Sequence, residues 1–87
     1  MKQADIAVLQ RSIEKISRSS ALGTRIRRVG VEAEADPEGD TFLRVSLELD
    51  RTDDLEWDNV EPLVRSIEDA VGAVDDRFPS VYFADAA

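Results

Sequence analysis

The 87-residue chain contains no cysteine and no histidine. The lack of cysteine excludes disulfides, thiolate metal sites and a cysteine nucleophile. The lack of histidine removes the commonest general base and the commonest transition-metal ligand. No apolar run approaches the roughly 18–20 residues that span a bilayer, and the N-terminal stretch has no signal-peptide pattern. We therefore expect a cytoplasmic protein that makes no contact with a membrane.

Motifs of catalysis and cofactor binding are also missing. The four glycines are scattered along the chain and form neither a Walker-type loop nor a Gly-x-Gly-x-x-Gly fingerprint. No serine lies in a Gly-x-Ser-x-Gly elbow. The sequence thus predicts a protein that is not an enzyme, with no catalytic residues, no cofactor and no small-molecule substrate.

Charge is unevenly distributed. The net charge is −8, but residues 1–47 carry 8 basic and 7 acidic groups, whereas residues 48–87 carry 3 basic and 12 acidic groups. Nucleic-acid binding depends on neutralising phosphates, so this balance argues against it in general. A local basic cluster nevertheless lies near the junction of the first predicted helix and the first predicted strand: Lys15, Arg18, Arg25, Arg27 and Arg28. This cluster is interpreted either as a solvated face or as a nucleic-acid contact.

Residues 3–20 are predicted to be a helix. Apolar side chains recur there at spacings of three and four, at Ile6, Leu9, Ile13 and Ile16. Gly23 follows shortly after and suits a left-handed C-terminal cap.

Residues 25–35 and 41–50 have a period of two and are predicted to form a hairpin around the turn at 36–40. If residues whose numbers sum to 76 face each other, Val31 meets Val45 and Val29 meets Leu47. On the other side, Glu32 then meets Arg44 and Arg28 meets Glu48, which are two opposite-charge pairs. A slip of one residue would set apolar side chains opposite charges, so the sequence favours this register.

A second helix is predicted over residues 59–77, beginning near Asp58 because Pro62 is tolerated only in a first turn. Asp58 and Glu61 form a capping-box pattern, and Trp57 is placed to pack on Leu63 or its neighbour as a hydrophobic staple. The apolar face comprises Val60, Leu63, Val64, Ile67, Ala70, Val71, Val74 and Phe78. Pro79 ends the helical pattern, and residues 81–83 are predicted to form a third strand.

These elements predict an α+β fold with residues 1–87 as a single domain. It is a two-layer α-β-β-α-β sandwich in which two helices cover one face of a three-stranded sheet. The other face is left open and is expected to carry Arg28, Gly30, Glu32, Phe42, Arg44, Ser46, Glu48 and Tyr82. Phe42 and Tyr82 are larger than solubility requires, so we interpret them either as a shield for the sheet or as a partner-binding patch. The predicted interaction surface is Phe42, Arg44, Tyr82, Arg28 and Glu32.

Carboxylates are numerous enough to suggest a site for a hard cation. Asp53, Asp54, Glu56 and Asp58 precede the second predicted helix, and Asp75 and Asp76 lie near its end. No twelve-residue calcium loop is present, and the first group suits the positive end of the helix. We predict that no metal binds.

The order of elements resembles the cytoplasmic C-terminal domain of cation diffusion facilitator transporters. Residues 24–84 carry the resemblance, with "TRIRRVGVEAEAD" and "TFLRVSLELD" as the hairpin and "RFPSVYFAD" after the second helix. The resemblance implies a dimerising regulatory module. The metal-binding histidines of that family are lacking, so metal sensing is not carried over. The chain also looks like short acidic bacterial proteins that act as partners or antitoxin-like neutralisers.

Two functional hypotheses follow. The first is a non-catalytic interaction or regulatory module that forms a homodimer or binds a protein partner, with its acidic second half facing a basic partner. The second is a nucleic-acid-associated module that uses the basic cluster. The net charge of residues 48–87 favours the first.

Overall fold

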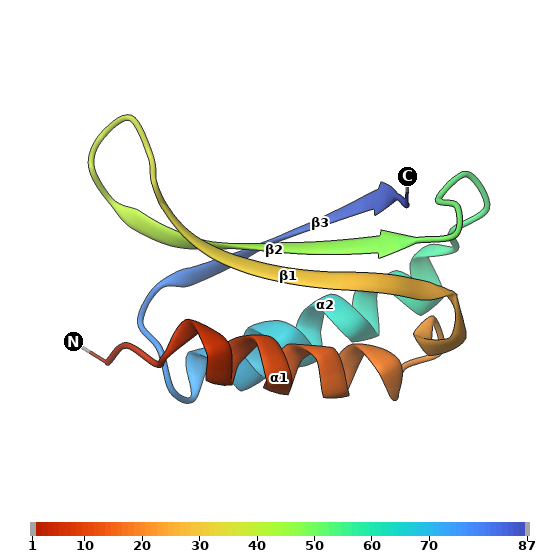
Figure 1. Ribbon diagram of the computed structural model, residues 1–87, viewed down its shortest axis with the longest axis horizontal. Coiled ribbons are helices and arrows are strands. Elements are labelled where there is room, and N and C mark those ends of the chain that lie inside the picture. Colours follow the sequence, from red (N-terminus) through yellow and green to blue (C-terminus); the bar gives the residue numbers. More distant parts are fainter. Residues whose placement is uncertain (1, 87) are drawn as a thin grey trace.

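The structure is a computed structural model that describes residues 2–86, and it confirms the α+β fold. Two helices lie side by side beneath one face of a three-stranded mixed sheet (Figure 1). The elements follow in the order α1 (Ile6–Arg18), a short 3₁₀ helix η1 (Gly23–Arg25), β1 (Ile26–Ala35), β2 (Thr41–Leu49), α2 (Trp57–Gly72) and β3 (Phe78–Asp85).

The β1–β2 hairpin has the predicted register. Arg28 faces Glu48 and Glu32 faces Arg44 across antiparallel strands. At the connecting turn Gly39 has a φ of 91°, which a glycine adopts at no steric cost. The pairing shifts by one residue between Ile26 and Arg28, an irregularity that the charge pattern did not predict.

Strand β3 pairs in parallel with β2, which gives the sheet order β1-β2-β3. It begins at Phe78, three residues before the predicted third strand, so Phe78 and Pro79 belong to the sheet and the prediction that Phe78 extends the second helix is wrong. The physical reason lies in the turn before it. The second helix ends at Gly72, and the Asp75 side chain accepts hydrogen bonds from the backbone N–H and the guanidinium of Arg77, which fixes the turn.

The core lies between the sheet and the two helices. Leu47 from β2 and Ile67 from α2 are fully buried there, as expected of central residues. The other buried apolar residues are Leu9, Ile13, Leu22, Ile26, Val29, Val31, Leu43, Val45, Leu49, Leu63 and Val71. Strand β3 adds the buried Pro79, and its Val81 and Phe83 pack on the cluster while half-buried.

The end of α1 differs from the prediction. The helix ends at Arg18, and Gly23 begins the 3₁₀ helix instead of capping α1 in a left-handed conformation. A glycine is still required there, because a Cβ at position 23 would lie 2.0 Å from the carbonyl oxygen of Arg18. The prediction of a left-handed cap at Gly23 is therefore wrong, and the close approach of the Arg18 carbonyl accounts for the glycine.

The start of α2 lies within one residue of the predicted start near Asp58, but its cap differs from the prediction. The helix begins at Trp57 with Glu56 as its N-cap, and the cap makes no side-chain hydrogen bond, so the predicted capping box is wrong. Trp57 is 66% exposed and does not act as a staple. Pro62 lies inside the helix and beyond its first turn, because the helix begins earlier than the proline rule suggested.

Candidate functional site

The candidate site is the face of the sheet that no helix covers. Side chains alternate between the two faces of a strand, and the odd-numbered residues in the central parts of β1 and β2 are buried against the helices: Val29, Val31, Leu43, Val45, Leu47 and Leu49. Their even-numbered neighbours therefore point to the open face, as predicted. A shallow depression of about 250 Å³ lies in this face and is lined by Arg28, Gly30, Glu32, Arg44, Ser46 and Glu48.

Aromatic side chains occupy the part of this face formed by β2 and β3. The guanidinium carbon of Arg44 lies 4.6 Å from the centre of the Tyr82 ring, within the range of a cation–π contact. Phe42 is paired with Phe78 across the parallel strands. Tyr82 is 42% exposed and Phe78 is 63% exposed. We refer to Phe42, Phe78 and Tyr82 as the aromatic patch.

Phe78 was not among the predicted surface residues. The Phe-Pro step was interpreted as the end of a helix, which assigned Phe78 to the core. The two-residue spacing of Phe78, Ser80 and Tyr82 was the available signal, because a strand that begins at Phe78 sets all three on one face.

The charged side chains of the open face pair differently from the prediction. Arg28 lies 3.7 Å from Glu48, as expected. Arg44, however, lies 3.9 Å from Glu34 and not against Glu32, its neighbour in the register. Within residues 2–86, Glu32 makes no ion pair. Glu32 and Arg44 therefore face each other in the predicted register, but the predicted ion pair between their side chains does not form.

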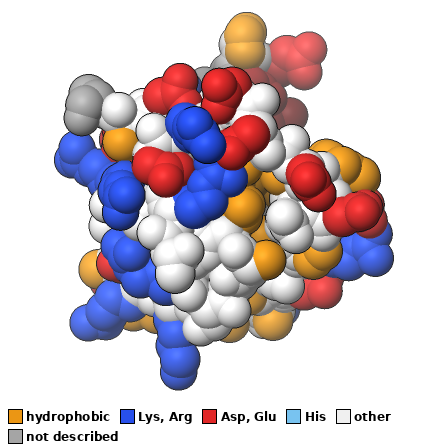
Figure 2. Space-filling view, turned by 90° about the vertical axis from the view of Figure 1, so that its right-hand side faces the viewer, with side chains coloured by type: hydrophobic (Ala, Val, Ile, Leu, Met, Phe, Trp, Pro, Cys, Tyr) orange, Lys and Arg blue, Asp and Glu red, His pale blue; other side chains and the backbone are white. Residues whose placement is uncertain are grey.

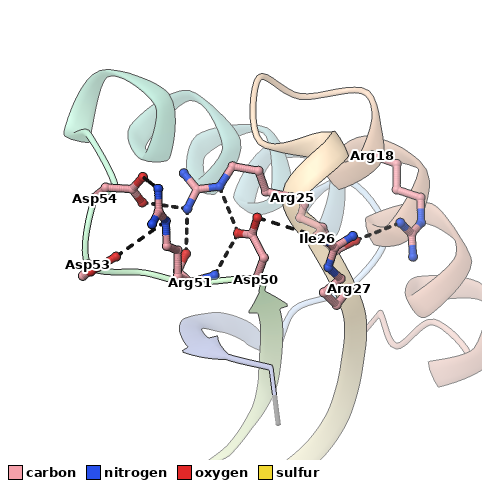
Figure 3. Close-up of polar contacts among 8 residues, drawn as sticks. All are labelled: Arg18, Arg25, Ile26, Arg27, Asp50, Arg51, Asp53 and Asp54. Carbon is pink, nitrogen blue, oxygen red and sulfur yellow. Dashed lines mark hydrogen bonds and ion pairs between the residues drawn. The ribbon is translucent and has the colours of Figure 1, made fainter.

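The predicted basic cluster is largely engaged with carboxylates (Figure 3). Arg25 donates hydrogen bonds to Asp50 at 3.1 Å, to Asp54 at 2.7 Å and to the carbonyl of Arg51 at 2.8 Å. The hydrogen bond from Arg25 lowers the pKa of the Asp54 carboxyl and, likewise, that of Asp50. Arg27 lies 4.0 Å from Asp50.

Arg18 completes this arrangement. It pairs with Glu14 at 3.2 Å and donates a hydrogen bond to the carbonyl of Ile26 at 3.2 Å. Figure 2 shows the charged side chains on one side of the molecule. Carboxylates lie among basic side chains near the top, and further basic side chains follow along the left flank. Part of the acidic group at 53–58 is thus used to neutralise the basic cluster.

Two further groups of carboxylates have structural roles. Asp36, Glu38 and Asp40 offer oxygens within 4.8 Å of one another, but Asp36 already accepts hydrogen bonds from the backbone N–H groups of Glu38 and Asp40 in the hairpin turn. Asp75 is buried and paired with Arg77 at 2.7 Å. Hydrogen bonds from Arg77 hold the pKa of the Asp75 carboxyl well below its usual range.

A second hollow lies between the C-terminal end of α1 and the N-terminal half of α2. Its volume is about 410 Å³, and it is lined by Ile16, Ser19, Ser20, Ala21, Asp58, Asn59, Pro62, Leu63 and Ser66. Sequence reasoning did not find this hollow, because it depends on how the two helices pack together.

No helix within residues 2–86 combines the length and apolar character needed to cross a bilayer. Comparison with protein-family models, with curated proteins and with solved structures gives no match. The resemblance of residues 24–84 to the transporter domain therefore stays a prediction.

Proposed function

We propose that the protein is a non-catalytic interaction module that associates with a second copy and binds a protein partner on its open sheet face. The observation that carries this proposal is the aromatic patch. Three rings lie on a face that no helix covers, and Phe78 and Tyr82 expose much of their surface. Aromatic residues and arginine are enriched at the centres of protein interfaces, and Arg44 is stacked on Tyr82 here.

The charge of the chain supports a partner with basic groups. Residues 48–87 carry most of the negative charge, and the exposed side chains of α2 include Asp58 and Asp69. Such a field attracts a basic protein and speeds the encounter, as an antitoxin-like neutraliser requires. The resemblance of residues 24–84 to a dimerising regulatory domain implies the same class of role.

Ion pairing weighs against the nucleic-acid alternative. A phosphate would have to displace carboxylates from four of the five basic residues in the cluster, namely Arg18, Arg25, Arg27 and Arg28. We expect no binding of single-stranded RNA or duplex DNA at about 150 mM salt, a condition that weakens phosphate contacts. Fluorescence anisotropy with labelled oligonucleotides measures this directly, and binding in the micromolar range would favour the alternative.

Site-specific photo-crosslinking tests the partner-binding face. A photoreactive phenylalanine analogue is placed at Phe78, and the matched control carries it at Val8, a 50% exposed residue of α1. We expect the analogue at position 78 to give discrete crosslinked species in extracts of the source organism. Tyr82→Glu should remove them without changing the melting temperature. The proposal fails if positions 78 and 8 give the same products.

A further inference from the structure

Strand β1 is an edge of the sheet, and its backbone groups alternate in direction. The N–H of Asp36 donates to the carbonyl of Asp40 at 2.9 Å, so even-numbered residues of this strand direct their backbone groups toward β2. The N–H and C=O groups of Val29, Val31 and Ala33 therefore point to the free edge. The side chains of Val29 and Val31 are buried in the core, and within residues 2–86 no strand pairs with this side of β1.

The free stretch of β1 has a defined beginning. Arg18 already donates to the carbonyl of Ile26, and the register shift follows before Arg28. The edge available for pairing thus starts at Val29. The opposite edge of the sheet, formed by β3, offers fewer backbone donors. The backbone N–H of Ala86 donates to the carbonyl of Leu49, so even-numbered residues of β3 direct their backbone groups toward β2. Pro79 therefore lies on the free side of β3, where a proline supplies no N–H.

Two charged side chains lie symmetrically about the middle of β1. Arg28 and Glu32 are each two residues from Gly30, and both lie on the open face. The Arg28 side chain is 80% exposed, and its one ion pair in the described part of the chain is the 3.7 Å contact to Glu48. Glu32 makes no ion pair within residues 2–86. One charge of each sign is therefore available beside the edge.

We infer that two copies of the chain pair their β1 strands antiparallel about a two-fold axis at Gly30. In this register Arg28 meets Glu32 of the second copy, and Glu32 meets Arg28 of the second copy. Val29 and Val31 exchange backbone hydrogen bonds with Val31 and Val29 of the second copy, through the groups that point to the free edge. The product is one continuous sheet of six strands with all helices on one face. The inference rests on the self-association in the proposed function and specifies its surface.

Charges at a sheet edge usually prevent pairing, so their sign and spacing matter here. A parallel, in-register pairing would set Arg28 against Arg28 and Glu32 against Glu32. An antiparallel pairing centred on Glu32 would also bring like charges together. One centred on Val31 would match Arg28 with Glu34 and would leave Glu32 opposite a glycine. The register centred on Gly30 is the one that pairs both available charges.

Charge reversal with mixing tests this register. Glu32→Arg sets two arginines against each other at each end of the paired segment, and Arg28→Glu sets two glutamates against each other. We expect the wild type to sediment as a dimer at about 100 µM, and each variant to weaken the dimer about tenfold. An equimolar mixture of the two variants should restore the dimer, because the introduced glutamate of one chain then faces the introduced arginine of the other. Glu38→Arg in the hairpin turn and Arg65→Glu on α2 are matched controls that should leave the dimer unchanged.

Three results would overturn the inference. If both variants remain as dimeric as the wild type, with circular dichroism showing an intact fold, the β1 edge is not the interface. Association on the open face would then be shown by dissociation of Phe78→Glu. If both variants dissociate and the mixture stays monomeric, the register is wrong. If the wild type is monomeric up to about 300 µM, self-association itself fails, while crosslinking from position 78 still decides whether the open face binds a partner.

Discussion

Asp75 and Arg77, two residues apart in the turn between α2 and β3, form a buried ion pair that also holds the N-terminal segment. Two nitrogens of Arg77 donate to the two oxygens of Asp75, at 3.0 Å and 2.7 Å. Asp75 also accepts a hydrogen bond from the backbone N–H of Ala4, and Arg77 donates to the carbonyl of Ala4. The carboxylate is fully buried and Arg77 is 10% exposed. Removing either charge would leave the other buried without its counter-charge.

Asp75→Asn is therefore expected to lower the free energy of unfolding by about 3 kcal/mol, the effect of breaking a buried pair from one side. The matched control is Asp76→Asn, whose exposed carboxylate accepts a hydrogen bond from the backbone N–H of Lys2. The control should cost less than about 1 kcal/mol. Urea denaturation of both variants gives the comparison. Equal losses would mean that the buried pair contributes no more than the surface contact.

Acid should remove the same contribution. The pKa of the Asp75 carboxyl lies below its ordinary value in the folded protein because Arg77 donates hydrogen bonds to it. A depressed folded pKa stabilises the protein above the unfolded pKa of about 3.9, and this stability is lost as the pH falls further. The wild type should thus lose stability below about pH 4, and Asp75→Asn should lose less over the same range.

Melting temperatures between pH 2 and pH 6 measure this difference. Asp50 and Asp54 also have lowered pKa values and also destabilise the fold in acid, so the wild type must be compared with Asp75→Asn at each pH. The difference between their melting temperatures should become smaller as the pH falls. A constant gap would show that Asp75 contributes through its shape and not through its charge.

The core prediction concerns Leu47 and Ile67, both fully buried at the contact of sheet and helices. Truncating either to alanine should cost about 2–4 kcal/mol, from lost apolar burial and the cavity left behind. Val74→Ala, at a residue that is 48% exposed in the turn after α2, should change stability by less than about 0.5 kcal/mol. Chemical denaturation gives the three values, and a core variant that matches Val74→Ala would contradict the packing.

Two glycines provide a test of backbone fit. Gly23→Ala would place a Cβ against the carbonyl of Arg18, and a rigid backbone clash of this kind should cost about 1–3 kcal/mol. Gly72, the last residue of α2, has no atom within 4 Å of an added Cβ. Gly72→Ala should be neutral or stabilise by up to about 1 kcal/mol, because alanine favours a helix. The melting temperature of Gly23→Ala should therefore fall, while that of Gly72→Ala should stay the same or rise. A fall of the same size in both variants would contradict the tight turn after α1.

The sequence allowed the hairpin to be predicted because two independent signals agreed. The alternation of Val29, Val31, Val45 and Leu47 and the placement of opposite charges both specify one register. The faces of Arg28, Glu32, Phe42, Arg44 and Tyr82 followed from the alternation of side chains along paired strands. The partner of Arg44 did not, because its side chain can reach Glu34 and the Tyr82 ring as well as Glu32.

Element ends were harder to predict because tertiary contacts decide them. The early end of α2 depends on Asp75 binding Arg77 and the distant Ala4, which no local pattern shows. The role of Phe78 was missed for the same reason, since its placement in β3 follows from that turn. The hollow between α1 and α2 arises from the packing of two elements about 40 residues apart in the chain.

The central place of β2 has a consequence for how the chain folds during synthesis. The β1–β2 hairpin is local in sequence and can form early, whereas the parallel partner of β2 is made only after α2. Until residues 78–85 leave the ribosome, one side of β2 lacks hydrogen-bond partners, and Val81 and Phe83 do not yet cover the core. A nascent chain that ends at residue 77 should therefore be cleaved quickly by a protease, while one extended past residue 85 and clear of the exit tunnel should resist it. The sheet is completed in a single late step, and the period of exposure to chaperones or misassembly is set by the time needed to translate α2 and β3.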